Sequence, residues 1–233
     1  MSTKWRSLAL ILWLSLYASL APAQQPSWET LNTAGMHAYN HGQYPKAKRL
    51  FCEALDSLES TSQADPRLVH TLNNLGAAQE ALGEYEQAEL SYRQSLTIVE
   101  KIQGSDHPDL VLGLNNLASL YFTQGQYPKA VPLLRRGLGI LERLLGPEHP
   151  HLVQILKRLA VVTQAQRRYD QAEEWYARAI RITEKTLGPY HPHLATILDQ
   201  YAGLLRQSNR DEEAKMVEKQ AAAIRAHNIQ PGN

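Results

Sequence analysis

Apolar residues along most of this chain recur at the spacing of an amphipathic helix. Between Pro108 and Gly125 they lie mostly three or four residues apart, which places them on one helical face: Leu110, Leu114, Leu117, Leu120 and Tyr121. The segment "GQY" at 125–127 interrupts this pattern, and a second apolar stretch continues to Gly146, where a helix is expected to stop. The chain has no long β-branched run, so the pattern predicts two helices joined by a turn rather than a sheet.

The same pair of helices recurs along the chain. Three His-Pro joints are spaced 42 residues apart, at 107–108, 149–150 and 191–192, and an Asp-Pro joint at 65–66 lies 42 residues before the first. The apolar segments keep the same phase, as "LNNLG" from Leu72, "LNNLA" from Leu114, "LKRLA" from Leu156 and "LDQYA" from Leu198, whereas "LNTAG" from Leu31 is one residue out of step. A fixed period of this size is typical of a solenoid.

The period divides the chain into five units. We expect them at 28–64, 65–106, 107–148, 149–190 and 191–227, after a short segment 24–27 and before a disordered tail 228–233. The first helix of each unit should begin at the joint Pro, with the preceding Asp or His as its N-cap. In the third unit Pro132, Gly137 and Gly139 lie inside the second helix, so we expect that helix to be kinked or to start late.

Two sets of small residues recur in these units. One set is Gly35, Gly76, Ala118, Ala160 and Ala202, and the other is the alanines at 47, 88, 130, 172 and 214, accompanied by tyrosines at 44, 85, 127 and 169. With these positions the chain resembles the tetratricopeptide-repeat family, and its 42-residue unit is similar to the repeats of kinesin light chains and their bacterial relatives. The resemblance implies an all-α, right-handed α-solenoid of about five helix pairs, in which the first helices line a concave groove that binds peptides.

The first residues have a different character. Lys4 and Arg6 precede an apolar run over residues 8–20, and the small residues Ala21 and Ala23 follow it. This order predicts a signal peptide over residues 1–23, cleaved after Ala23, and therefore export to a bacterial periplasm or secretion. An uncleaved anchor is the alternative. A cytosolic adaptor would require this prediction to be wrong.

Composition narrows the classes of partner. The 24 basic and 23 acidic side chains give a net charge of +1, without the basic excess that nucleic-acid binding requires. We also expect no stable membrane insertion of the mature chain. Cys52 is the single cysteine, so no internal disulfide can form, and its apolar helical surroundings indicate a packed side chain rather than a reactive thiol.

The sequence does not indicate an enzyme. It contains no nucleophile elbow, HExxH helix or phosphate-binding Gly-rich loop, and no cofactor or metal is expected. The histidines of the joints occupy equivalent places in successive units, which form a ladder rather than converge on one point. A His-based metal enzyme remains the remote alternative, and it would require His149, His151, His191 and His193 to converge.

The candidate binding residues lie on the first helices. Asn is a mediocre helix former, yet "NN" recurs inside two of them, and an amide both donates to and accepts from the backbone of an extended peptide. In the repeats that the chain resembles, matching Asn residues do this, and an Asn beside Lys or Arg is similar to part of a carboxylate clamp. The peptide-binding residues so implied are Asn74, Asn116 and Arg158, with Asn73, Asn115, Lys157, Phe122 and Tyr39.

The alternative interpretation of these residues is structural. Asn73 and Asn115 would then stabilise contacts between neighbouring units, and Lys157 and Arg158 would be plain surface. For the whole chain we expect a scaffold of the cell envelope that holds an extended or acidic segment of a protein partner in its groove. A structural or assembly component of an envelope or secretion complex, acting through its convex face, is the alternative.

Overall fold

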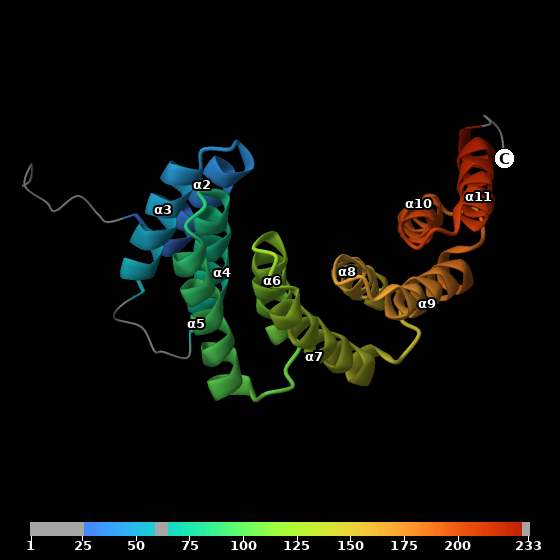
Figure 1. Cartoon of the computed structure of the whole chain (residues 1–233). Helices are drawn as coiled ribbons and strands as arrows, with labels where there is room; N and C mark the ends of the chain where they lie inside the picture. The colour runs from blue at the N-terminus through green and yellow to red at the C-terminus, as the bar shows by residue number, and fades with distance from the viewer. Residues whose placement is uncertain (1–25, 59–64, 230–233) are drawn as a thin grey trace, which may run out of the picture.

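The computed structural model describes residues 26–58 and 65–229, and these form ten helices and no strand (Figure 1). The helices are α2 (Trp28–Asn40), α3 (Tyr44–Asp56), α4 (Pro66–Ala81), α5 (Tyr85–Gln103), α6 (Leu110–Thr123), α7 (Tyr127–Leu145), α8 (Leu152–Ala165), α9 (Tyr169–Leu187), α10 (Pro192–Gln207) and α11 (Asp211–Ile229). The predicted signal peptide and the segment 24–25 lie outside the described residues, as do residues 230–233.

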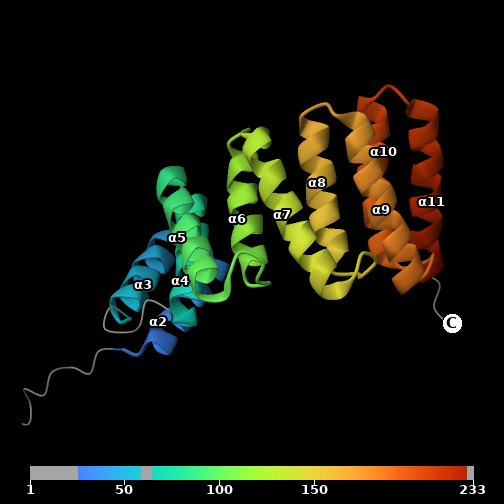
Figure 2. The same ribbon diagram turned by 90° about the horizontal axis from the view of Figure 1, so that it is seen from below.

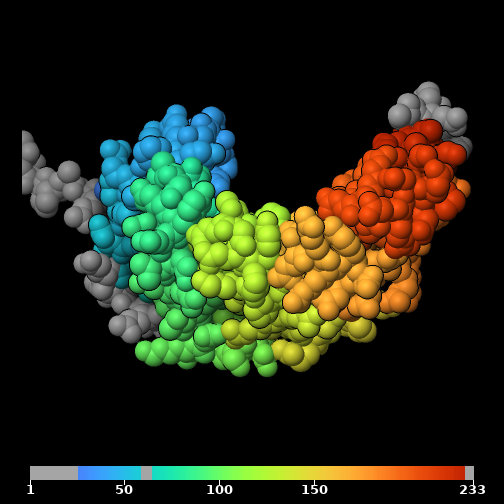
Figure 3. Space-filling model, in the orientation of Figure 1, coloured from blue at the N-terminus to red at the C-terminus, as the bar shows by residue number. Residues whose placement is uncertain are grey.

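Each helix packs against the next along the chain, and the five pairs follow one another in an arc. In Figure 1 the inner side of the arc is formed by α4, α6, α8 and α10, and the outer side by α5, α7, α9 and α11. Figure 2 shows helices α6 to α11 following one another across the molecule, and Figure 3 shows a hollow between the raised ends of the molecule. The predicted all-α solenoid of helix pairs is therefore confirmed, with the first helices of the units on the concave side.

The joint residues expected as N-caps take that place in two helices, Asp65 in α4 and His191 in α10. The N-caps of α6 and α8 are instead Asp109 and His151, which form no side-chain cap hydrogen bond. The Asp65 carboxylate accepts a hydrogen bond from the backbone N–H of Arg67 at 2.9 Å. The Nδ1 atoms of the three joint histidines accept from the N–H two residues on, at 3.3 Å for His107, 3.2 Å for His149 and 3.2 Å for His191. Regular helix begins at the joint Pro in α4 and α10, whereas α6 and α8 begin two residues later than predicted, at Leu110 and Leu152.

The turn within each unit requires a left-handed backbone. Its residue is glycine in the first three units, with φ of 70°, 77° and 70° at residues 42, 83 and 125. Arg167 and Asn209 take the same place in the last two units, with φ of 58° and 61°. The turn is thus conserved in shape where the sequence pattern changes, although a side chain makes this conformation less favourable.

The two helices of a unit approach closely at the small residues. A methyl group added at Gly76 would lie 2.6 Å from a ring carbon of Tyr92, and one added at Gly35 would lie 2.6 Å from a ring carbon of Phe51. The five recurrent alanines of the second helices are all fully buried: Ala47, Ala88, Ala130, Ala172 and Ala214. Small residues at these places therefore set the distance between the two helices of a pair.

The second helix of the third unit differs from its prediction. Helix α7 begins at Tyr127, in the same place as its counterparts, so the expected late start is wrong. Pro132 lies only five residues after that start and removes one hydrogen bond. Gly137 is buried, and a methyl group there would lie 2.9 Å from Ile155, so this glycine allows α7 and α8 to approach closely.

The end of the solenoid also extends further than predicted. Helix α11 continues to Ile229, so residues 228 and 229 are helical rather than part of a disordered tail. The Asn228 side chain explains part of this, because its Nδ2 donates to the backbone carbonyls of Tyr190 at 2.6 Å and of Ile224 at 2.8 Å.

The close approach at Gly76 can be tested with a pair of alanine substitutions. Gly76→Ala should lower the free energy of unfolding by about 1–3 kcal/mol, because the Tyr92 ring must move. Gly203→Ala, inside α10 with open space around it, should raise the free energy of unfolding by about 1 kcal/mol through helix propensity. Urea unfolding followed by circular dichroism measures both, and shifts of the same sign would contradict the packing argument.

Candidate functional site

A ladder of asparagine side chains connects the inner helices of the first three units. The Asn74 Nδ2 donates to Asn32 Oδ1 at 3.1 Å, and the Asn116 Nδ2 donates to Asn73 Oδ1 at 3.4 Å. Asn73 also donates to the backbone carbonyl of Val69 at 2.8 Å and is only 3% exposed. Asn73 therefore stabilises the contact between neighbouring units and has little surface to offer a ligand.

The ladder stops at the fourth unit. Lys157 and Arg158 lie one period after Asn115 and Asn116, so Arg158 occupies the place of the next amide donor. The Asn115 Oδ1 is buried and accepts no hydrogen bond from the described residues. In the fifth unit the Oε1 of Gln200 is in the same situation. The change from Asn-Asn to Lys-Arg therefore leaves the buried Asn115 Oδ1 without the donor that the ladder would otherwise supply.

The same change places an uncompensated cation in the groove. Five described Lys and Arg residues are half-buried, and all of them except Lys157 form ion pairs: Lys48, Arg136, Arg178 and Arg210. Burial and the adjacent charge of Arg158 lower the pKa of the Lys157 ammonium. Arg158 is exposed and likewise has no ion pair among the described residues. An anion at this place would relieve both the desolvation and the repulsion.

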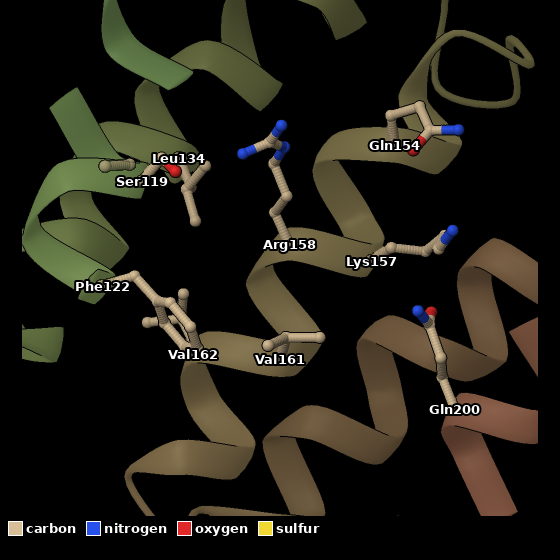
Figure 4. Close-up of a pocket in the computed structure, with 10 residues that line it drawn as sticks. Ser119, Phe122, Leu134, Gln154, Lys157, Arg158, Val161, Val162 and Gln200 are labelled. Carbon is tan, nitrogen blue, oxygen red and sulfur yellow. The ribbon is translucent and has the colours of Figure 1, made fainter. Parts of the chain in front are cut away.

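These cations lie at a pocket of about 310 Å³ on the inner helices α6, α8 and α10 (Figure 4). In Figure 4 the Arg158 side chain extends toward Ser119 of α6, whereas Lys157 extends toward the side of Gln200 on α10. The remaining lining is largely apolar: Ala118, Phe122, Leu134, Val161 and Val162, with Gln154 at the edge. The pocket thus combines two cations with an apolar wall.

A second pocket, of about 340 Å³, adjoins the first. Both are lined by Ser119 and Arg158, and the second extends along the groove to Tyr39, Glu80 and Asn116. Of the predicted binding residues, the structure therefore brings Tyr39, Asn116 and Arg158 together in one pocket, and Phe122, Lys157 and Arg158 in the other. Asn73, Asn74 and Asn115 line neither pocket. Asn73 and Asn74 form hydrogen bonds of the ladder, whereas Asn115 is the acceptor at which the ladder stops.

The sequence analysis missed Glu80. A signal for it exists, because Glu80 lies 42 residues before Phe122 and 41 residues after Tyr39, which is the spacing of equivalent places in these units. Equivalent places in successive units lie side by side, so an acidic residue at the place that is aromatic in the units before and after it is a candidate groove residue.

The joint histidines that the sequence left as a remote metal-site alternative lie in two separate pairs. The rings of His149 and His151 lie 4.8 Å apart and those of His191 and His193 lie 5.0 Å apart, each pair within its own joint. Among the described residues, no group of three or more His, Cys, Asp and Glu side chains is arranged to hold a metal ion.

Cys52 is half-buried, and burial raises the pKa of its thiol. No helix in the described part of the chain is long and apolar enough to cross a membrane.

The fold defines a helical-repeat protein with a concave groove. The profile described as "Tetratricopeptide repeat" matches residues 67–143, 109–185 and 151–226 in overlapping register. The chain belongs to the tetratricopeptide-repeat family. Proteins with this fold are generally protein-interaction scaffolds rather than enzymes. A search of curated proteins found no match to the sequence.

Solved structures agree with the kinesin-light-chain resemblance. Nearly identical tetratricopeptide-like repeats of a Podospora anserina kinesin light chain share 24% identity, with a TM-score of 0.78 over 87% of this chain and 96% of that one. BtubC (BKLC) of P. vanneervenii shares 20% identity, with a TM-score of 0.77 over 88% and 82%. Aspartyl phosphate phosphatase F of Bacillus subtilis shares 15%, with a TM-score of 0.71 over 87% and 52%. At these identities the likeness concerns the fold alone.

The interrupted ladder predicts that Arg158 reduces stability. In Arg158→Asn the new amide can donate to Asn115 Oδ1, as Asn116 does to Asn73, and the free energy of unfolding should rise by about 1 kcal/mol. Because this gain depends on the acceptor, it should disappear in an Asn115→Ala background. Urea unfolding of the four proteins in this double-mutant cycle measures the coupling, and an equal gain in both backgrounds would contradict the interpretation.

Proposed function

We propose that this protein is an interaction scaffold that binds an extended, acidic segment of a protein partner in its concave groove. The observation that carries the proposal is Lys157, a half-buried cation without an ion pair among the described residues, beside the free guanidinium of Arg158. A carboxylate that enters the pocket would form charge-assisted hydrogen bonds with both groups.

The surroundings of the cations support a peptide rather than a small anion. Phe122, Val161 and Leu134 line the same pocket and offer an apolar surface to a ligand side chain. Gln200 lines the same pocket, and its side-chain amide is of the type that both donates to and accepts from a peptide backbone. The two adjoining pockets continue along the groove from α8 toward α2, so an extended chain could occupy both.

The proposal can be tested with acetylated and amidated ten-residue peptides that contain a Glu-Glu pair, each matched by a Gln-Gln counterpart. The acidic peptides should bind more tightly than their counterparts. The double variant K157Q/R158Q should reduce their affinity by about tenfold or more, as expected for the loss of charged hydrogen bonds of about 1.5–3 kcal/mol. Fluorescence anisotropy or calorimetric titration measures the affinities.

The matched control is K101Q/K219Q, which removes two exposed lysines that lack ion pairs among the described residues and changes the net charge equally. This control should bind the peptides like the unmodified protein. An equal loss of affinity in both variants would mean that net charge, rather than the two groove cations, causes the effect. Undiminished binding by K157Q/R158Q would move the binding surface to the convex face or to the ends of the solenoid.

The location of the protein is a further part of the proposal: export to the envelope of a bacterial cell. It is supported by the order of Lys4, Arg6, the apolar residues 8–20 and Ala23. Expression of the full chain in a bacterial host should place the protein in the periplasmic fraction, with Gln24 as its first residue by N-terminal sequencing. An intact N-terminus at Met1 in the cytoplasmic fraction would contradict export.

A further inference from the structure

The part of the groove opposite the cations carries a carboxylate. Glu80 of α4 is half-buried and forms no ion pair among the described residues. The Tyr92 hydroxyl donates a hydrogen bond to Glu80 Oε2 at 3.1 Å. Burial raises the pKa of the Glu80 carboxyl, and this hydrogen bond offsets the rise only in part. Glu80 is therefore the acidic counterpart of Lys157.

Aromatic rings surround this carboxylate. The pocket that contains Glu80 is also lined by Tyr39 and Tyr92. Tyr92 is 1% exposed and its hydroxyl is engaged by Glu80, so its ring is fixed. Tyr39 is half-buried and makes an edge contact with Tyr44, at 5.4 Å between ring centroids. A carboxylate beside tyrosine rings suits an ammonium or guanidinium group, which gains from both the charge and the ring faces.

The acidic and basic ends of the groove share one pocket but do not neutralise each other. Glu80 and Arg158 both line the pocket of about 340 Å³, yet no ion pair joins these two described residues. Ser119 and Asn116 lie between them as polar lining. The space between the two side chains can therefore take a ligand with a positive charge at Glu80 and a negative charge at Arg158.

We propose that the groove selects a dipolar peptide segment, with a Lys or Arg side chain at Glu80 and an acidic side chain at Lys157 and Arg158. This inference rests on the proposed function and adds a second subsite to it. The cation of the ligand lies against Tyr39 and the Glu80 carboxylate, while its acid lies in the first pocket. The two subsites together fix the direction and register of the ligand, which the acidic subsite alone would leave open.

The geometry limits the separation of the two charges in the ligand. Glu80 of α4 and Arg158 of α8 line the same pocket of about 340 Å³. A pocket of that volume is roughly 9 Å across if it is taken as a sphere. An extended peptide rises about 3.3 Å per residue, so the charges of the ligand should lie about two to four residues apart.

The test uses acetylated and amidated ten-residue peptides in which one Lys and a Glu-Glu pair are separated by one to six residues, in both orders. Each has a partner peptide with Gln in place of Lys. The unmodified protein should bind one order best, at a separation of about two to four, and about fivefold or more tightly than the Gln partner. Glu80→Gln should abolish this difference and leave the affinity for the Gln partner unchanged. Its amide oxygen can still accept from Tyr92.

Glu86→Gln is the matched control, because Glu86 is exposed on α5 and has no ion pair among the described residues. It should preserve the full preference for Lys. If Lys and Gln peptides bind equally at every separation while K157Q/R158Q still weakens both, the cation subsite is refuted and the acidic subsite stands. If Glu80→Gln weakens both peptides equally, Glu80 supports the fold and the inference is overturned. If no acidic peptide binds the unmodified protein, the proposed function is refuted, and the second subsite is refuted with it.

Discussion

The structure depends on the close approach of two helices at small buried side chains. The recurrent alanines of the second helices are fully buried, and Gly35 and Gly76 leave no room for a methyl group against Phe51 and Tyr92. Since this contact recurs in each pair, equivalent side chains of successive units lie side by side along the arc. A ladder of hydrogen bonds between inner helices, and any interruption of it, follows from that repetition.

The interruption in the fourth unit connects the fold with binding. Where Asn116 donates to Asn73, Arg158 leaves Asn115 Oδ1 without a donor, and Lys157 is half-buried without an acid. Both features disfavour the free protein, since buried polar groups without partners reduce stability. A ligand that supplies a carboxylate compensates for the charge. Loss of stability at a binding surface is a recurrent property of proteins, because selection acts on function above a stability threshold.

Much of the fold was predictable because it depends on local signals. The 42-residue spacing, the joint Pro and the recurrent small residues predict the helix pairs, and Asp65 and His191 cap α4 and α10 as expected. The late start expected for α7 was wrong, because Pro132 lies near the helix start and Gly137 serves a contact with α8. The sequence left two roles open for Asn73, a ligand contact and a contact between units, because the answer depends on which neighbouring unit the side chain reaches. For Glu80 the sequence offered only its spacing from Tyr39 and Phe122.

The most direct measurement is the structure of the protein with an acidic ten-residue peptide, by crystallography or by NMR. The account predicts a ligand carboxylate within about 2.7–3.0 Å of the Lys157 ammonium or the Arg158 guanidinium, with the peptide extended along α8 and α6. A peptide found on the outer helices, or in the groove with its acidic side chain away from both cations, would contradict the account.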